Sequence, residues 1–208
     1  MRVRNSLIAI VTLALFLATP LSAVSVTAGV ATEQIRATVD KALLVLKDPH
    51  LKPPAKTKDR RDQLKQILFT RFDFTEMAKR ALGANWRRRA PYEQEEFVRL
   101  FSDLLERAYA ETIESYTDEK IIYVGERLDG NYADVNSKIV TSKGEEFSIN
   151  YRAHLIGGEW RVYDVVVENI SMVNNFRSQF NRVISSSSYE ELVRRLKDKQ
   201  ADIKARKN

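Results

Sequence analysis

Asp164 is the side chain of this sequence that is best placed to act as a general acid or base. It lies within Trp160–Val167, WRVYDVVV, where most of its neighbours are apolar or aromatic. Burial among such side chains raises the pKa of a carboxyl group, which could then exchange protons near neutral pH. A buried aspartate can instead pair with an arginine or accept backbone N–H groups, and we favour this structural role.

The rest of the sequence offers few parts for a catalytic or metal site. It contains no cysteine and two histidines, His50 and His154. Thiol chemistry and disulfides are therefore excluded, and His-based nucleophile pairs or metal sites have few possible members. We expect His154 on the polar face of its strand, in solvent, and His50 beside the loop at Pro53–Pro54. There is no glycine-rich phosphate loop and no paired-carboxylate motif. The sequence thus predicts no catalytic residue, no metal and no cofactor, and a protein that is not an enzyme.

Basic charge is spread along the chain instead of forming one patch. The formal net charge is +6 over 208 residues, and Lys and Arg alternate with Asp and Glu. A nucleic-acid binder is expected to concentrate basic residues on one face, so we predict no nucleic-acid partner. The run Arg87–Arg89 is the one dense basic cluster, and we interpret it as a solvated helix end or loop.

The first 28 residues resemble an export signal. Arg2 and Arg4 precede the apolar stretch Leu7–Ala18, and small residues follow Pro20. A spanning anchor needs about 20 strongly apolar residues, so we favour a signal peptide over residues 1–28, with cleavage near 23 or 28. Residues 29–208 then form one domain, and an exported protein without cysteine is expected in the periplasm.

The first half of this domain has the periodicity of helices. Apolar residues recur at helical spacing from Ile35 to Leu46, and further helices are predicted over about 59–70 and 75–82, before Gly83. A long helix begins at Pro91, a favourable first-turn residue. Its wide, aromatic-rich stripe comprises Phe97, Leu100, Phe101, Leu104, Leu105, Ala108, Tyr109, Ile113 and Tyr116. Such a stripe typically packs in a core, and it can also cover a cavity.

The second half has the alternation and turn signals of an antiparallel meander. Four strands are predicted over 121–128, 132–142, 147–156 and 160–170, and two helices follow. The fold class is therefore α+β: a curved four-stranded antiparallel meander packed against N-terminal helices and the long aromatic helix, with C-terminal helices. A long helix in the concavity of a bent sheet makes a cone with an apolar interior, which suits a ligand site.

The fourth strand is apolar on both faces. Regular alternation places Trp160, Val162, Val166 and Ile170 on one face and Tyr163, Val165 and Val167 on the other. A strand of this kind needs a second covering layer or lines a cavity. We predict that the cavity is lined by Phe97, Phe101, Leu104, Leu105, Tyr109, Phe147, Ile149, Tyr151, Val162, Val166 and Val167.

Three consecutive motifs resemble the signature of the MlaC/toluene-tolerance family. They are WRVYDV at Trp160–Val165, ENISMV at Glu168–Val173 and NFRSQF at Asn175–Phe180. Upstream, Ala81–Gly83 with Trp86 and the stripe from Phe97 to Tyr109 also resemble the family's pattern, so that the likeness covers about residues 30–199. Asn169 stands where the family usually has glycine, and Phe176 where tyrosine is common.

This resemblance implies a periplasmic phospholipid-binding shuttle. Its implied fold is an α+β cone similar to nuclear transport factor two, which holds acyl chains of a phospholipid cargo without a cofactor. The implied partners are an inner-membrane ABC-transporter lipid complex and an outer-membrane lipoprotein–porin complex, and the protein is expected to be a monomer. Two alternatives stay open: the hopanoid-biosynthesis-associated branch of the family, and a ketosteroid-isomerase-like enzyme that uses Asp164.

Overall fold

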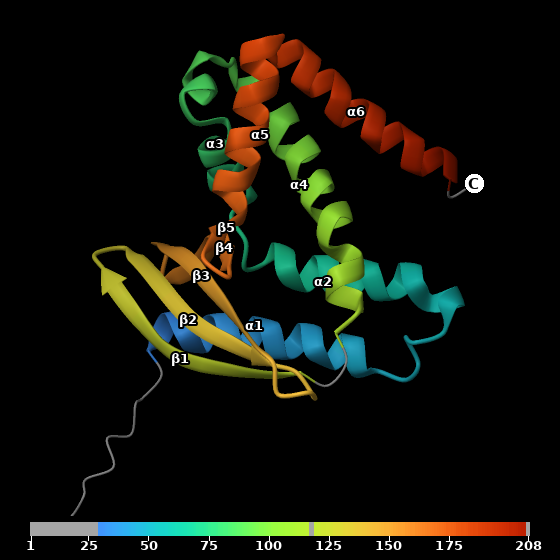
Figure 1. Cartoon of the computed structure of the whole chain (residues 1–208), viewed down its shortest axis with the longest axis vertical. Coiled ribbons are helices and arrows are strands. Elements are labelled where there is room, and N and C mark those ends of the chain that lie inside the picture. The colour runs from blue at the N-terminus through green and yellow to red at the C-terminus, as the bar shows by residue number, and fades with distance from the viewer. Residues whose placement is uncertain (1–28, 117–118, 207–208) are drawn as a thin grey trace, which may run out of the picture.

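The computed structural model describes residues 29–116 and 119–206, with side chains as far as residue 200. The signal segment predicted over residues 1–28 lies outside these ranges. The elements are α1 (Val30–Lys47), η1 (Pro54–Lys56), α2 (Thr57–Phe69), α3 (Phe74–Leu82), η2 (Gly83–Arg88), α4 (Pro91–Glu114), β1 (Lys120–Asp129), β2 (Tyr132–Val140), β3 (Glu146–Ile156), β4 (Glu159–Val167), β5 (Ile170–Ser171), α5 (Met172–Ser186) and α6 (Tyr189–Arg206). Figure 1 shows two halves: a curved sheet with α1 beside it, and a group of helices made by α3, α4, α5 and α6. The predicted α+β class is confirmed.

The sheet is an antiparallel meander in the order β1-β2-β3-β4-β5, and α1 packs against one face of it. The helix presents small and apolar residues at helical spacing, with Ala31 and Ile35 fully buried against Val135, Ala153 and Trp160. The meander is confirmed, and the short β5 is an addition to the four predicted strands.

The long helix α4 does not lie in the concavity of the sheet, which corrects the sequence prediction. It packs against α3 and α6 in a second core. Its Phe101 ring lies 5.3 Å from the ring of Phe176 and 5.6 Å from that of Phe180, both on α5. Edge-to-face aromatic packing of this kind is favourable, and the bulky stripe of α4 makes these contacts with α5. The slimmer α1 covers the sheet instead.

The two halves are joined by the segment between α2 and α3. Val162 N donates to Arg71 O and Asp73 N donates to Val162 O, each at 2.8 Å, so this segment runs along β4. The Arg71 guanidinium also donates to Trp160 O at 2.8 Å. Asp73 Oδ2 lies 2.9 Å from His154 Nε2 on β3. His154 is thus mostly buried in a hydrogen-bonded contact between the halves, and the expectation that it is solvated is wrong.

A β-bulge in β4 changes which residues share a face. Ala153 pairs with Val162, whereas Arg152 pairs with Asp164, so Tyr163 is an extra residue in the ladder. Val162 and Val165 consequently lie on the α1 side. The predicted face assignment, which put Val162 with Val166, is wrong because regular alternation has no place for the extra residue.

The fourth strand ends at Val167, three residues before the predicted end. Glu168 and Asn169 have φ angles of 48° and 65°, in the left-handed region. They turn the chain back so that Ile170 pairs with Val167 in β5. Asparagine adopts this region more readily than most residues other than glycine, which explains how Asn169 is accommodated in this turn.

Candidate functional site

An apolar pocket lies between α2 and α4, beside the first residues of α3 and α5. One wall is formed by Leu64, Leu68 and Phe69 of α2, and the opposite wall by α4. The full lining is Arg61, Leu64, Lys65, Leu68, Phe69, Phe72, Phe74, Met77, Ser102, Leu105, Glu106, Tyr109, Ala110, Ile113, Glu114 and Met172. The apolar residues of α2 and α4 face each other here, and they leave a cavity of about 130 Å³.

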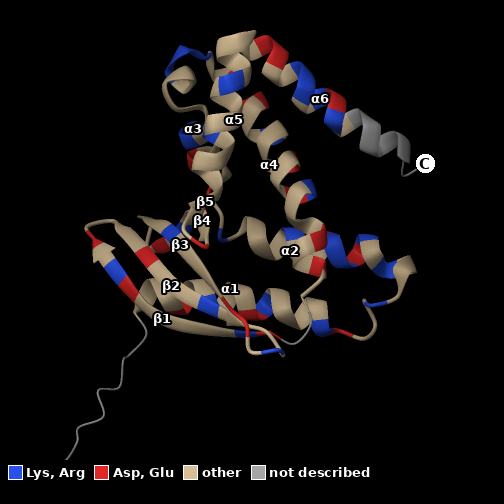
Figure 2. Ribbon diagram, viewed as in Figure 1, with Lys and Arg blue, Asp and Glu red and all other residues tan. Residues whose placement is uncertain are grey.

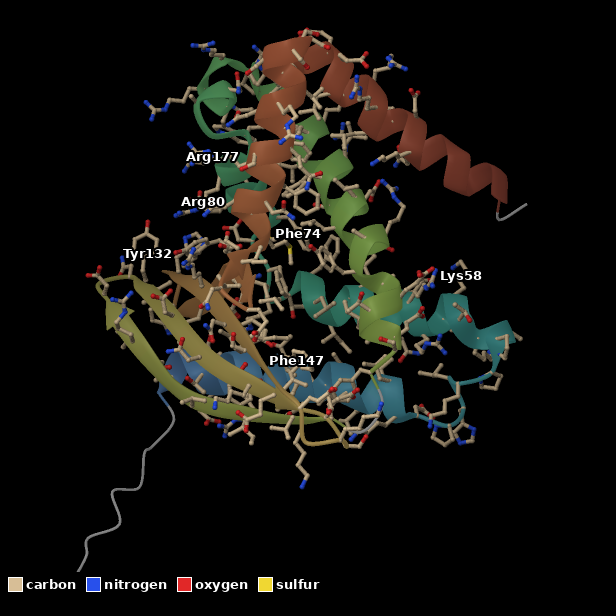
Figure 3. All side chains as sticks on the ribbon, in the orientation of Figure 1. Lys58, Phe74, Arg80, Tyr132, Phe147 and Arg177 are labelled. Atoms are coloured by element: carbon tan, nitrogen blue, oxygen red, sulfur yellow. The ribbon has the colours of Figure 1, made fainter. Side chains whose placement is uncertain are left out.

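Aromatic rings close the end of the pocket nearest to the sheet. The Phe69 and Phe74 ring centroids are 4.4 Å apart, and those of Phe72 and Phe74 are 6.0 Å apart. Figure 3 labels Phe74 on the helical side and Phe147 on the sheet. The phenyl groups at this end favour an apolar ligand.

Charged pairs between α2 and α4 form the rim of the pocket. Arg61 Nη2 lies 2.7 Å from Glu114 Oε2, and Arg60 Nη2 lies 2.9 Å from Glu114 Oε1. Lys65 Nζ lies 2.7 Å from Glu106 Oε2. These pairs connect the two helices across the apolar space, so that the walls are held by ionic contacts at the rim and by apolar side chains inside.

The electrostatics of the rim favour the ionised carboxylate. Hydrogen bonds from Arg61, and secondarily from Arg60, hold the pKa of the Glu114 carboxyl below its ordinary value. The same contact raises the pKa of Arg61. Deeper in the pocket, burial raises the pKa of the Tyr109 phenol. The site therefore has a charged rim and a neutral, apolar interior.

Two of the α4 residues predicted to line a cavity do so. Leu105 and Tyr109 line the pocket. Phe97 and Phe101 are instead fully buried against other aromatic rings, and Leu104 packs against the same core. The wide stripe of α4 thus serves both purposes, core packing over its first half and pocket lining over its second.

The predicted sheet residues divide between a core and an exposed edge. Val162 is buried beneath α1, and Tyr151 packs against the same core. Val166 is buried and Ile149 is partly buried. Phe147 and Val167 are 42% and 43% exposed, and they lie near the exposed Ile170 at the end of the sheet. None of these six residues lines the apolar pocket in this structure.

Many of the pocket residues missed by the sequence prediction lie on α2 and in the segment that follows it, and the others lie on α3, α4 and α5. They include Leu64, Leu68, Phe69, Phe72 and Phe74. A signal was present, because three phenylalanines lie within six residues in FTRFDF, Phe69–Phe74. Rings so close in sequence, beside a helix whose other residues are mostly charged or polar, indicate an apolar surface that needs a partner.

Asp164 has a structural role. It is 3% exposed and accepts hydrogen bonds from Ser171 Oγ at 2.6 Å and from Val173 N at 3.0 Å. Arg152 Nη1 donates to the same carboxylate at 3.2 Å. The side chain thus binds the first turn of α5 to β4, which is the arrangement favoured from the sequence.

Within residues 29–116 and 119–206, no group of three or more His, Cys, Asp and Glu residues is placed to hold a metal ion. Over the same ranges, no helix has the length and apolar character required to cross a membrane.

The decisive comparison concerns residues 36–198, which match the family model of the MlaC protein. The chain belongs to the MlaC protein family. A solved phospholipid-binding protein from Ralstonia solanacearum, in complex with a phospholipid, has the same fold. That structure superposes with a TM-score of 0.74 at 26% identity, covering 83% of this chain and 97% of the other.

Two curated relatives support the MlaC assignment. The intermembrane phospholipid transport system binding protein MlaC of Haemophilus influenzae is 24% identical over 122 residues, covering 56% of this chain and 57% of the relative. The toluene tolerance protein ttg2D of Pseudomonas putida is 29% identical over 121 residues, covering 57% of this chain and 56% of the relative. The alignments thus span little more than half the length of each relative.

Proposed function

We propose that this protein binds a phospholipid and carries it through the periplasm between an outer-membrane and an inner-membrane transport complex. The observation that carries the proposal is the apolar pocket between α2 and α4, in a fold shared with a protein that was solved with a phospholipid. The acyl chains occupy this pocket, and the head group remains near the charged rim or in water.

The pocket must widen to take a whole acyl chain. Its volume is about 130 Å³, and a cavity of roughly 150 Å³ holds one benzene-sized ligand. Separation of α2 from α4 would enlarge it. The exposed Phe147, Val167 and Ile170 at the end of the sheet then offer further apolar surface to a chain that leaves the pocket.

The energetics suit a carrier. Burial of each CH₂ group is worth about 0.8 kcal/mol, so a chain of about sixteen carbons represents on the order of 12 kcal/mol. A bilayer offers the same chain nearly the same free energy, so exchange is close to balanced. Such a protein needs apolar lining and few contacts to the head group.

Native mass spectrometry of the gently purified protein tests lipid binding. We expect phospholipid at one per chain, and organic extraction of that lipid decides between a phospholipid and a hopanoid cargo. Protein that is consistently empty, and that transfers no labelled lipid between vesicles, contradicts the proposal.

Replacement of two alanines of α4 by tryptophan, one at a time, tests the location of the site. Ala110 lines the pocket, whereas Ala108 is exposed on the same helix. A110W fills the cavity and is expected to reduce lipid occupancy strongly. A108W adds the same side chain in solvent and should leave occupancy unchanged. Equal occupancy in the two variants would place the chains elsewhere.

A further inference from the structure

A second, polar groove lies on the other side of the contact between α3 and α5. It has a volume of about 780 Å³ and is bordered by α3, η2 and α5 on one side and by β1–β4 on the other. Met77 and Met172 face the apolar pocket, whereas Lys79 and Val173 face the groove. The two spaces are therefore separated by the packed helices, and the groove is a distinct site.

The groove has an excess of positive charge. Five arginines and one lysine line it, against three aspartates. The basic residues are Lys79, Arg80, Arg87, Arg127, Arg152 and Arg177. Figure 2 shows basic residues on α3, η2 and α5 along the same side of the helical half, and Figure 3 shows Arg80 and Arg177 extending on that side above Tyr132.

The acidic groups near the groove are largely engaged. Asp134 pairs with Arg127 at 2.7 Å, and the buried Asp164 is held by Arg152 and the first turn of α5. Glu76 accepts hydrogen bonds from Lys79 and Arg80. These pairs leave Arg87 and Arg177, on the helical wall, without an acidic partner among the described residues.

The guanidinium groups of Arg87 and Arg177 have no hydrogen bond or ion pair with any residue described in the structure. The side chain of Arg177 lies over Gly83. A Cβ atom at Gly83 would come within 2.9 Å of Arg177 Nε. The φ angle of Gly83 is +55°, which also favours glycine. The chain thus positions a free guanidinium over a backbone that has no side chain.

We propose that this groove is a docking site for an acidic segment of a partner protein. Guanidinium groups pair with carboxylates in a two-pronged geometry, and Arg87 and Arg177 provide two that are free. The aromatic side chains of Trp86, Tyr132 and Tyr163 border the same groove and give the segment surface to pack against. A flat bilayer cannot follow a groove with walls on two sides, which favours a protein segment over anionic lipid. The inference does not depend on lipid binding.

A labelled acidic peptide, (Asp-Glu)₄, provides the probe. Fluorescence anisotropy with the mature protein at low ionic strength is expected to show binding that weakens as salt is added. The groove variant R87E/R177E should weaken binding by about tenfold or more. The matched control R99E/R182E changes the charge equally at exposed arginines outside the groove and should change binding by less than about twofold.

The two tryptophans report where the peptide binds. Trp86 borders the groove, whereas Trp160 is buried beneath α1. In a ¹H–¹⁵N spectrum, with W160F as the assignment control, we expect the peptide to shift the Trp86 indole signal and leave the Trp160 signal in place. Circular dichroism and urea unfolding test whether the variants fold. If R87E/R177E does not fold, R87Q/R177Q takes its place.

Three results would overturn the proposal. The peptide could fail to bind, it could bind the groove and control variants equally, or it could leave the Trp86 signal unmoved. Phosphatidylglycerol vesicles supply the remaining comparison. If vesicles bind through Arg87 and Arg177 and the peptide does not, the groove is a membrane contact and not a protein docking site.

Discussion

Arg61 and Glu114 lie 2.7 Å apart across the rim of the apolar pocket, and Arg60 contacts the same carboxylate. The side chain of Glu114 is 12% exposed, so its negative charge balances two guanidinium groups at a largely buried position. Glu114→Gln should therefore lower the free energy of unfolding by about 1–3 kcal/mol at pH 7. Urea unfolding measures this difference.

The effect of Glu114→Gln should depend on pH. The arginines lower the pKa of Glu114 in the folded protein, so the ionised group stabilises the fold above its unfolded pKa of about 4.3. This contribution is lost as the pH falls through the lower, folded pKa. The gap between wild type and variant should close in acid. Asp62→Asn removes an exposed pair with Lys58 and should cost less than about 1 kcal/mol; equal costs would show that the rim pair is an ordinary surface contact.

Replacement of Asp164 should cost stability and leave the pocket intact. Asp164→Ala removes the acceptor for Ser171 Oγ and Val173 N and leaves Arg152 without this partner. We expect a loss of about 2–4 kcal/mol in urea unfolding. Ser171→Ala removes the N-terminal cap of α5 and should cost about 1 kcal/mol. Lipid occupancy of folded Asp164→Asn should equal that of the wild type, whereas an unchanged free energy of unfolding would contradict the structural role.

The aromatic stripe of α4 should separate into core and pocket residues. Phe101 is fully buried among other rings, so Phe101→Ala should lower the free energy of unfolding by about 3–5 kcal/mol. Ile113 lines the pocket and is partly exposed, so Ile113→Ala should cost less than about 2 kcal/mol but lower lipid occupancy. Paired unfolding and native mass measurements check this division. Equal losses of stability would mean that Ile113 is an ordinary core residue.

The elements of this fold were predictable from local patterns, and their packing partners were not. The helical periodicity around Ile35 and the turn signals at Gly130 gave correct elements because they depend on neighbours within one turn or hairpin. The choice between α1 and α4 as the helix on the sheet depends on side-chain shape across distant segments. The helix on the sheet carries small residues such as Ala31, and the helix in the second core carries bulky residues such as Phe101. Hydrophobic periodicity counts both residues as apolar and does not distinguish their sizes.

Two features limited the prediction of the site: the bulge in β4 and the charged composition of α2. The bulge at Tyr163 shifts the alternation of β4 by one residue, so Val165 and Val166 exchange faces relative to a regular strand. In α2, charged residues outnumber apolar ones, and Leu64 is its one buried side chain. Its apolar residues form a pocket wall only because α4 lies opposite them, and the sequence of α2 alone does not indicate this partner.

Asn169 offers a test of the turn that ends β4. Its φ angle is 65°, where a β-branched side chain is strained and glycine is not. Asn169→Val should lower the free energy of unfolding by about 1–2 kcal/mol, since left-handed backbone costs this much for such residues. Asn169→Gly should stay within about 0.5 kcal/mol of the wild type, because the relief of strain offsets the greater freedom of the unfolded chain. Asn169 is exposed, so the contrast reports backbone strain and not lost packing; a tolerated valine would show that residues 168–169 adopt another turn.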